Sequence, residues 1–193
     1  MKNKIFTYPI FLIFFMLFSS ENFAKNSTNK ETIILAGGCF WGVEELFQNF
    51  EGVVETEVGY TGGFSENPTY DTVSTGLSGH AESVKITFDN SKTSLEKILK
   101  FFFAIHDPTQ LNRQQNDVGT QYRSEIFYFN EVQKQKALNI IDQAEKLNIY
   151  KAKIQTKLSL VSKFYKAEKY HQNYLKNNPN GYTCHYLREE WKF

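Results

Sequence analysis

The stretch from Ile33 to Glu45, IILAGGCFWGVEE, changes its hydrophobic period in the middle and places Cys39 at the change. Residues 32–36 form a short apolar run rich in β-branched side chains, which predicts a buried strand. Residues 43–50 then carry apolar side chains at the spacing of one helix face. Cys39 is therefore predicted to lie at a strand-to-helix turn, after two glycines that give the backbone the freedom a tight turn needs.

Two interpretations of Cys39 remain open from this position alone. A helix N-terminus offers free N–H groups that stabilise a thiolate, so the turn predicts a lowered thiol pKa and a reactive nucleophile. A cysteine flanked by apolar residues is otherwise usually a buried and inert side chain.

The elements that follow occur in an order that is typical of one fold. Further strands are predicted over residues 53–60, 82–89 and 123–129, and a second helix runs from a capping box at residues 93–96 to His106. The order strand, helix, strand, strand, helix, strand predicts an α+β fold of the ferredoxin-like split βαβ type. We expect a two-layer core in which two helices cover one face of the sheet.

The C-terminal part is predicted to add to this core and to make the sheet mixed. Asn130 is placed to cap a third helix, and residues 154–158 alternate like an added strand. Residues 167–174 suggest a short last helix, and the tail from residue 177 is predicted to be irregular. Two long loops, at residues 61–79 and 109–121, connect the core elements.

Glu82 begins the third predicted strand on the same face as Val84, Ile86 and Phe88. A carboxyl group in a core-facing row is partly desolvated, which raises its pKa and suits it to donate a proton near neutral pH. A glutamate at a strand end can also bend out into water, so this interpretation stays open beside the first.

Residues 1–24 are predicted to be a signal peptide, and residues 25–32 a flexible lead-in to one domain at residues 33–193. Two lysines precede an unbroken apolar run over residues 10–18. That run has the length of a signal-peptide core and is shorter than the roughly 20 residues of a membrane span. We expect export to a bacterial-type periplasm or cell envelope, with an uncleaved N-terminal membrane anchor as the alternative.

Charge and composition argue against two classes of function. The formal net charge is +1 without a basic block, so nothing predicts nucleic-acid binding, and the four histidines lack the spacing of metal ligands. The two cysteines are Cys39 and Cys184. In an exported protein, the compartment alone would favour a structural disulfide between them.

Six motifs, taken in order, carry a resemblance to a known family. They are GGCFWG at 37–42, VGYTGG at 58–63, NPTY at 67–70, GHAE at 79–82, HDPT at 106–109 and GTQYRS at 119–124. The chain from Ile33 to Cys184 closely resembles the A-type peptide methionine sulfoxide reductases. The resemblance implies an enzyme that reduces the S epimer of methionine sulfoxide, free or in oxidised proteins, and so repairs them.

The same resemblance implies the roles of the two cysteines and of Glu82. Cys39 would attack the sulfoxide sulfur while Glu82 acts as general acid. The resulting Cys39 sulfenic acid would condense with Cys184 to a disulfide. Thioredoxin, a thioredoxin-like protein or, in vitro, dithiothreitol would reduce that disulfide, with no bound cofactor. Many members carry a second tail cysteine that is absent here, which implies resolution in one step, and the family resemblance implies a monomer.

Five further side chains receive roles from the resemblance only. Tyr70 and Tyr122 match hydroxyls that hydrogen-bond the sulfoxide oxygen, and Asp117 matches an acidic residue that helps to arrange the site. Phe40 and Trp41 match an aromatic wall for the substrate methyl group.

Two competing functions remain open from the sequence. A thiol peroxidase would share the sulfenic acid step but would reduce a peroxide. An envelope binding module would use the disulfide for stability only. Turnover of methionine sulfoxide separates both from the reductase.

Overall fold

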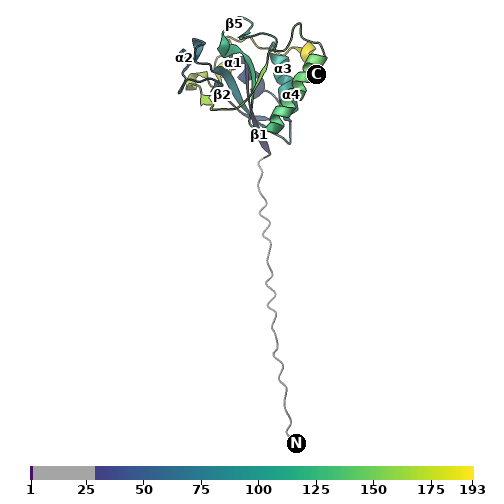
Figure 1. Cartoon of the computed structure of the whole chain (residues 1–193). Coiled ribbons are helices and arrows are strands. Elements are labelled where there is room, and N and C mark those ends of the chain that lie inside the picture. The colour runs from purple at the N-terminus through teal and green to yellow at the C-terminus, as the bar shows by residue number, and fades with distance from the viewer. Residues whose placement is uncertain (2–28) are drawn as a thin grey trace.

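The computed structural model describes Met1 and residues 29–193 (Figure 1). Apart from Met1, the predicted signal peptide at residues 1–24 lies outside the described residues, and so do residues 25–28 of the predicted lead-in. The first strand, β1 (Lys30–Gly37), begins inside that predicted lead-in and three residues before the predicted domain start at Ile33. No helix within the described part of the chain is long and apolar enough to cross a membrane.

One six-stranded sheet forms the centre of the fold, in the order β7-β6-β1-β3-β2-β8. Its strands are β1, β2 (Val53–Thr61), β3 (Ala81–Asp89), β6 (Ser124–Tyr128), β7 (Lys157–Leu160) and β8 (Tyr165–Lys166). The four inner strands pair antiparallel in the split βαβ order, whereas β7 pairs parallel to β6. The predicted α+β fold with a mixed sheet is therefore confirmed.

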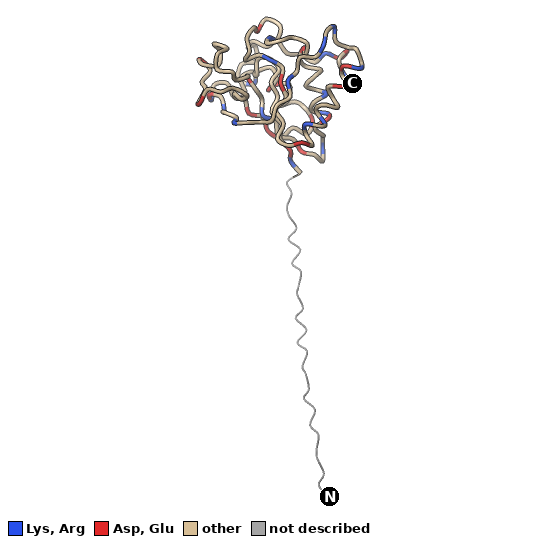
Figure 2. The backbone as a smooth tube through the Cα atoms, in the orientation of Figure 1, with Lys and Arg blue, Asp and Glu red and all other residues tan. Residues whose placement is uncertain are grey.

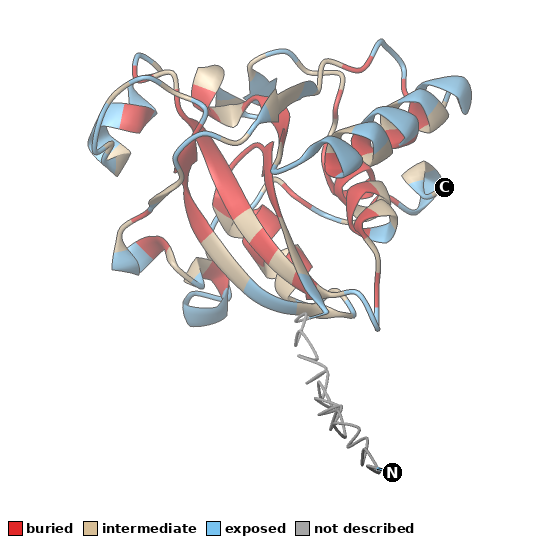
Figure 3. Cartoon of the chain, turned by 60° about the horizontal axis from the view of Figure 1, so that its bottom comes forward, coloured by how far each residue is buried: buried red, intermediate tan, exposed pale blue. Residues whose placement is uncertain are grey.

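Helices cover one face of this sheet and enclose the main core. They are α1 (Phe40–Gln48), α3 (Leu95–Ile105) and α4 (Glu131–Lys146), of which α4 packs on α3. The apolar row of β3 that starts after Glu82 points into this core, as its alternation predicts. Figure 3 shows the buried residues concentrated on the central strands and on the helix sides that face them.

The opposite face of the sheet is closed by the connection between β7 and β8. Val161 and Phe164 from this connection pack on a small cluster formed by Ile34, Ala36, Ala81 and Phe127. Both faces of β1 are thus buried, which explains why its sequence is a continuous apolar run rather than an alternating one.

Several predicted boundaries are wrong because short elements leave little periodicity. The loop at 61–79 contains α2 (Tyr70–Ser74), and the loop at 109–121 contains the hairpin β4 (Arg113–Gln114) and β5 (Asp117–Val118) and the start of a 3₁₀ turn. The strand predicted at 154–158 is β7, shifted toward the C-terminus. The helix predicted at 167–174 is a 3₁₀ turn at Lys169–His171 followed by α5 (Tyr174–Asn177). Asn173 separates these two because its backbone is left-handed, with φ of 55°.

Two local predictions also need correction. Helix α3 is capped by Ser94, whose hydroxyl accepts from the Lys97 N–H, and not by Thr93. Val54 shares the alternation of Val58 and Tyr60, which predicts the buried side of β2, but it is 45% exposed, since the register of β2 against β3 shifts between Val53 and Glu55. Asn130, in contrast, caps α4 as predicted.

Figure 2 shows basic and acidic residues interspersed along the described chain. Some of these charges hold strands together at the edge of the sheet. Glu57 on β2 lies 2.5 Å from Lys85 on β3 and 2.5 Å from Lys166 on β8. The short strand β8 is thereby tied to the sheet by charge as well as by its two backbone pairs.

Candidate active site

Cys39 is the N-cap residue of α1 and is separated from the end of β1 by Gly38, as the change of period predicts. Gly38 before it has φ of 109°, and a Cβ atom there would lie 2.7 Å from side-chain carbons of Gln114. The turn therefore needs glycine for its backbone angle and for the close approach of the β4 hairpin. Cys39 itself is only 6% exposed.

Glu82 reaches the same place because β1 and β3 are antiparallel neighbours. Their register pairs Leu35 with Val84, so the end of β1 and the start of β3 lie at the same edge of the sheet. The Phe40 N–H donates to Oε2 of Glu82 at 3.1 Å. Sequence spacing could not establish this juxtaposition, which depends on the strand order.

Burial raises the pKa of Glu82 to about 8, although the Phe40 N–H opposes the shift. The carboxyl group is therefore mostly protonated at neutral pH. This agrees with the expectation of a desolvated proton donor and not with a glutamate that bends out into water, since its exposed fraction is 2%.

The expectation of a lowered pKa for Cys39 is wrong in this structure. Burial raises the pKa of the Cys39 thiol well above its ordinary value, and the nearby carboxyl groups of Glu82 and Asp117 raise it further. The Trp41 backbone N–H at the start of α1 lowers it but does not outweigh the burial. Cys39 is thus a neutral thiol in this structure.

A cavity of about 110 Å³ brings most of the predicted site residues together. Seven of the eight line it, together with one residue that the sequence did not single out: Cys39, Phe40, Trp41, Tyr70, Glu82, Asp117, Tyr122 and Tyr182. Burial raises the pKa values of Tyr70 and Tyr122, so both hydroxyls keep their protons near neutral pH and can donate hydrogen bonds.

Phe40 and Trp41 form the apolar side of the cavity. The Trp41 ring stacks on Tyr174 with centroids 3.8 Å apart, and its Nε1–H donates to Nδ1 of His171 at 3.0 Å. These two contacts, which come from the C-terminal part of the chain, fix the orientation of the indole ring. His171 could not be found from the sequence, because nothing local links it to Trp41.

Cys184, the eighth predicted residue, lies beside the cavity and not among its lining residues. Its thiol lies 3.3 Å from Oδ2 of Asp117, while the Tyr182 hydroxyl donates to Oδ1 of the same carboxylate at 3.0 Å. Both cysteines are free in this structure. The tail from Tyr182 to Cys184 therefore contacts the β4–β5 hairpin at Asp117. The Asp117 side chain lines the cavity together with Cys39 and also contacts the thiol of Cys184.

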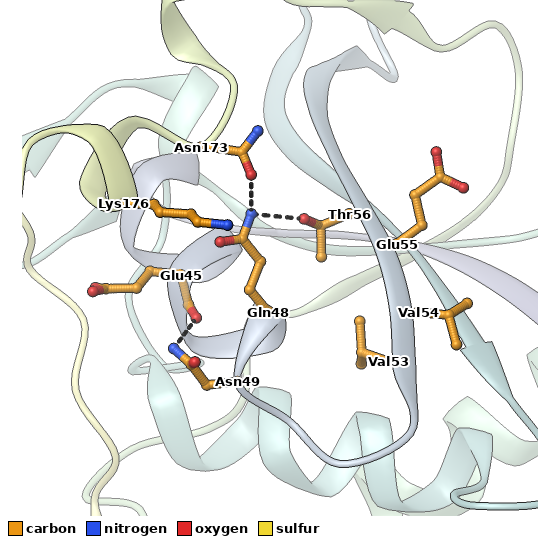
Figure 4. Close-up of a pocket in the computed structure, with 9 residues that line it drawn as sticks. All are labelled: Glu45, Gln48, Asn49, Val53, Val54, Glu55, Thr56, Asn173 and Lys176. Atoms are coloured by element: carbon orange, nitrogen blue, oxygen red, sulfur yellow. Dashed lines mark hydrogen bonds between the residues drawn. The ribbon is translucent and has the colours of Figure 1, made fainter.

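Two other observations bear on what the site can hold. The residues of the described chain form no group of His, Cys, Asp and Glu that could hold a metal ion. A larger and mostly polar hollow of about 540 Å³ lies between the end of α1 and β2, where Gln48 donates to Thr56 and Asn173 (Figure 4). None of the predicted site residues lines that hollow.

The small cavity therefore combines a thiol, a protonated carboxyl group, three phenols and an aromatic wall. Such a set can attack a polarised electrophilic atom with sulfur while donating a proton to an oxygen bound to that atom.

Comparisons with known proteins agree with this chemistry. A model of the family described as "Peptide methionine sulfoxide reductase" matches residues 31–192. The peptide methionine sulfoxide reductase MsrA of Mycobacterium leprae is 50% identical over 165 residues, which cover 86% of this chain and 91% of the relative.

Solved structures show the same relationship. Reduced Mxr1 from Saccharomyces cerevisiae has a TM-score of 0.79 and 36% identity, over 83% of this chain and 93% of that chain. Methionine sulfoxide reductase A of Corynebacterium diphtheriae has a TM-score of 0.74 and 40% identity, over 82% of this chain and 79% of that chain. The chain therefore belongs to the A-type peptide methionine sulfoxide reductases and is an enzyme that reduces methionine sulfoxide.

Proposed function

We propose that this enzyme acts on the S epimer of methionine sulfoxide, free or in oxidised proteins, and thereby repairs oxidised proteins. One observation carries the proposal: a thiol and a carboxyl group that is protonated at neutral pH share one small cavity with an aromatic wall. Reduction of a sulfoxide needs a nucleophile at sulfur and a proton at oxygen, and Cys39 and Glu82 supply one group for each task.

In the first step, the Cys39 sulfur attacks the sulfoxide sulfur while Glu82 donates its proton to the sulfoxide oxygen. Tyr70 and Tyr122 hold that oxygen by hydrogen bonds, and Phe40 and Trp41 receive the methyl group. The S–O bond of the substrate and the transient bond between the two sulfurs break, the oxygen ends on Cys39 as a sulfenic acid, and the substrate sulfur gains the two electrons that Cys39 loses. The thiol proton of Cys39 replaces the proton that Glu82 gives up, so Glu82 is protonated again at the end of the step. Methionine is released at this stage.

In the second step, the Cys184 sulfur attacks the sulfenic sulfur of Cys39. A Cys39–Cys184 disulfide forms, and the sulfenic oxygen leaves as water with the thiol proton of Cys184. The position of Cys184 at Asp117, which itself lines the cavity, supports this pairing.

Replacing Cys184 with serine tests whether its bond with Cys39 is catalytic or structural. Cys184→Ser is expected to release one equivalent of methionine per enzyme without a reductant and to stall with thioredoxin, because the sulfenic acid has no partner thiol. Both cysteines are free in the folded structure, so the melting temperature should change little. A variant that unfolds while its first turnover is intact would instead assign the bond a structural role.

Thioredoxin or a thioredoxin-like protein is proposed to reduce the disulfide by thiol exchange. The yeast relative Mxr1 supports this choice, since it has been solved in complex with Trx2, in a structure 24% identical to this chain with a TM-score of 0.58. The enzyme is proposed to work as a monomer and without a bound cofactor.

The decisive experiment uses residues 25–193, reduced, with dithiothreitol and each epimer of a blocked methionine sulfoxide. Methionine from the S epimer alone is the expected result. Equal turnover of both epimers would contradict the proposed stereochemistry. No turnover of either, with turnover of a peroxide, would favour a thiol peroxidase, and no turnover of any of them would favour a binding module.

We also propose that residues 1–24 direct export to the periplasm or cell envelope, with retention as a membrane anchor as the alternative. The apolar run over residues 10–18, after two lysines, supports this. Mass spectrometry of the full chain recovered from fractionated bacteria measures the outcome. A mature N-terminus near residue 25 in the periplasm is expected, whereas an intact chain in the cytoplasm would contradict export.

A further inference from the structure

The tail segment Thr183–His185 crosses directly over the turn that carries Cys39. A Cβ atom added to Gly42 in α1 would lie 2.3 Å from Oγ1 of Thr183 and 2.7 Å from Nδ1 of His185. A Cβ atom on Gly38 would lie 3.1 Å from Cε1 of His185. The tail thus fits where two glycines near Cys39 have no side chain: Thr183 and His185 lie against Gly42, and His185 lies beside Gln114 against Gly38.

His185 is buried and makes one strong contact with the turn. Its Nε2 lies 2.7 Å from the carbonyl oxygen of Gly37, and its exposed fraction is 6%. Since a carbonyl oxygen only accepts, Nε2 must carry the hydrogen of this bond. Burial lowers the pKa of His185 to about 4, so the ring is neutral at neutral pH and Nδ1 is left without a hydrogen.

This bond lies next to both cysteines along the chain. Gly37 is two residues before Cys39, and His185 directly follows Cys184, whose sulfur lies 3.5 Å from Nδ1 of the imidazole. Burial raises the pKa of Cys184 to about 12, and the backbone N–H of Cys39 is among the groups that oppose this shift, so the Cys184 sulfur lies near the Cys39 main chain. Apart from this histidine, residues 181–187 of the tail are irregular and half-buried or exposed, and the next buried residue is Arg188, whose backbone N–H donates to the Ala104 carbonyl at 3.0 Å.

We propose that His185 is a positioning residue for the second step: its hydrogen bond to the Gly37 carbonyl holds Cys184 where its sulfur can attack the sulfenic acid of Cys39. The inference rests on the proposed function. In the step that it serves, the Cys184 S–H bond and the Cys39 S–O bond break and the S–S bond forms. The sulfenic hydroxyl and the thiol proton leave as one water molecule, so no further reactant is needed, and His185 is unchanged at the end.

Glutamine and asparagine, whose side-chain amides resemble histidine in size, separate the contribution of the hydrogen bond to the Gly37 carbonyl from that of the rest of the imidazole ring. In His185→Gln, the amide N–H extends about as far as Nε2 and can still donate to the Gly37 carbonyl. In His185→Asn, the amide is one carbon shorter and reaches only the place of Nδ1. Tyr186→Ala is the matched control, because Tyr186 is on the same tail segment but 59% exposed and packs on Arg188, away from the cavity.

Three quantities are measured on each full-length variant after one addition of methionine sulfoxide without reductant: methionine released, loss of free thiols, and labelling of sulfenic acid by dimedone. His185→Asn is expected to release one equivalent of methionine at the rate of the parent enzyme. Its disulfide should form about 10-fold more slowly, the effect of losing one buried hydrogen bond, with sulfenic acid accumulating meanwhile. His185→Gln and Tyr186→Ala should form the disulfide at close to the parent rate.

Other outcomes overturn the inference. If His185→Asn forms the disulfide at the rate of the parent enzyme, the hydrogen bond between His185 and the Gly37 carbonyl is not needed. Equal slowing in His185→Gln and His185→Asn would assign the effect to the imidazole ring as a whole instead of to the Nε2 hydrogen bond, and a parallel loss of methionine release would mean general damage to the site. Failure of the parent enzyme to release methionine would refute the proposed function. Methionine release is measured separately from disulfide formation, so the two failures can be distinguished.

Discussion

Replacing Cys39 with serine is expected to reduce methionine production by at least about 10³-fold, to the level of the buffer blank. A serine hydroxyl does not form a stable product with the substrate oxygen. Neither the attack on the sulfoxide sulfur nor the transfer of its oxygen therefore takes place. The measurement is a single turnover on the S epimer without reductant, followed by quantification of methionine. Cys39 is buried at the start of α1 and bonded to no other side chain in the described chain, so the fold should tolerate the exchange of sulfur for oxygen.

Cys184→Ser is the matched control for Cys39→Ser, because it removes the other of the two cysteine thiols in the chain. It should still release one equivalent of methionine, whereas Cys39→Ser releases none. Near-equal melting temperatures of the two variants would show that the difference is chemical. Methionine production by Cys39→Ser at more than a few per cent of the parent rate would contradict the assignment of the nucleophile.

The core of the fold was predictable because its elements are long enough to show a period. The strand of residues 82–89 alternates clearly, and the first strand and helix differ in period on the two sides of Cys39. The C-terminal third was placed less well, since β8 has two residues and α5 has four. Elements of that length are held by tertiary contacts, such as the ion pair between Lys166 and Glu57, and leave no pattern in the sequence.

The site could be predicted in its parts but not in its electrostatics. Residue types and the strand-to-helix turn indicate Cys39, and the apolar row indicates Glu82. Their meeting depends on the antiparallel pairing of β1 with β3, which spacing does not fix. The predicted lowering of the Cys39 pKa was wrong because it considered the helix start alone. Burial and the carboxyl group of Glu82 act at the same sulfur and outweigh the backbone N–H.

Glu82→Gln is expected to slow the release of methionine in a single turnover by about 10²- to 10⁴-fold, the usual contribution of a general acid. Glutamine keeps the size of the side chain, and its amide oxygen can still accept from the Phe40 N–H, as Oε2 of Glu82 does at 3.1 Å. It cannot deliver a proton to the sulfoxide oxygen. The variant should therefore bind substrate and retain its fold while losing rate.

The pH dependence of the single-turnover rate tests this prediction most directly. The pKa of Glu82 is about 8, so the donor is present below pH 8 and is lost as the pH rises through that value. The parent single-turnover rate should have a falling limb near pH 8, and Glu82→Gln should lack it. A falling limb that persists in Glu82→Gln would transfer the donor role to another group, such as the hydroxyl of Tyr70 or Tyr122.

The same ionisation must also appear in the stability of the enzyme. The folded pKa of Glu82 is raised above the ordinary value of 4.5, so its contribution to the free energy of unfolding is complete below that value and is lost as the pH rises through about 8. Glu82→Gln carries no such group, so its stability relative to the parent should increase between pH 5 and pH 9. Denaturant titrations of both proteins at these two pH values measure the change. A difference that is independent of pH would mean that Glu82 does not ionise in this range, and the proton donor would then have to be assigned anew.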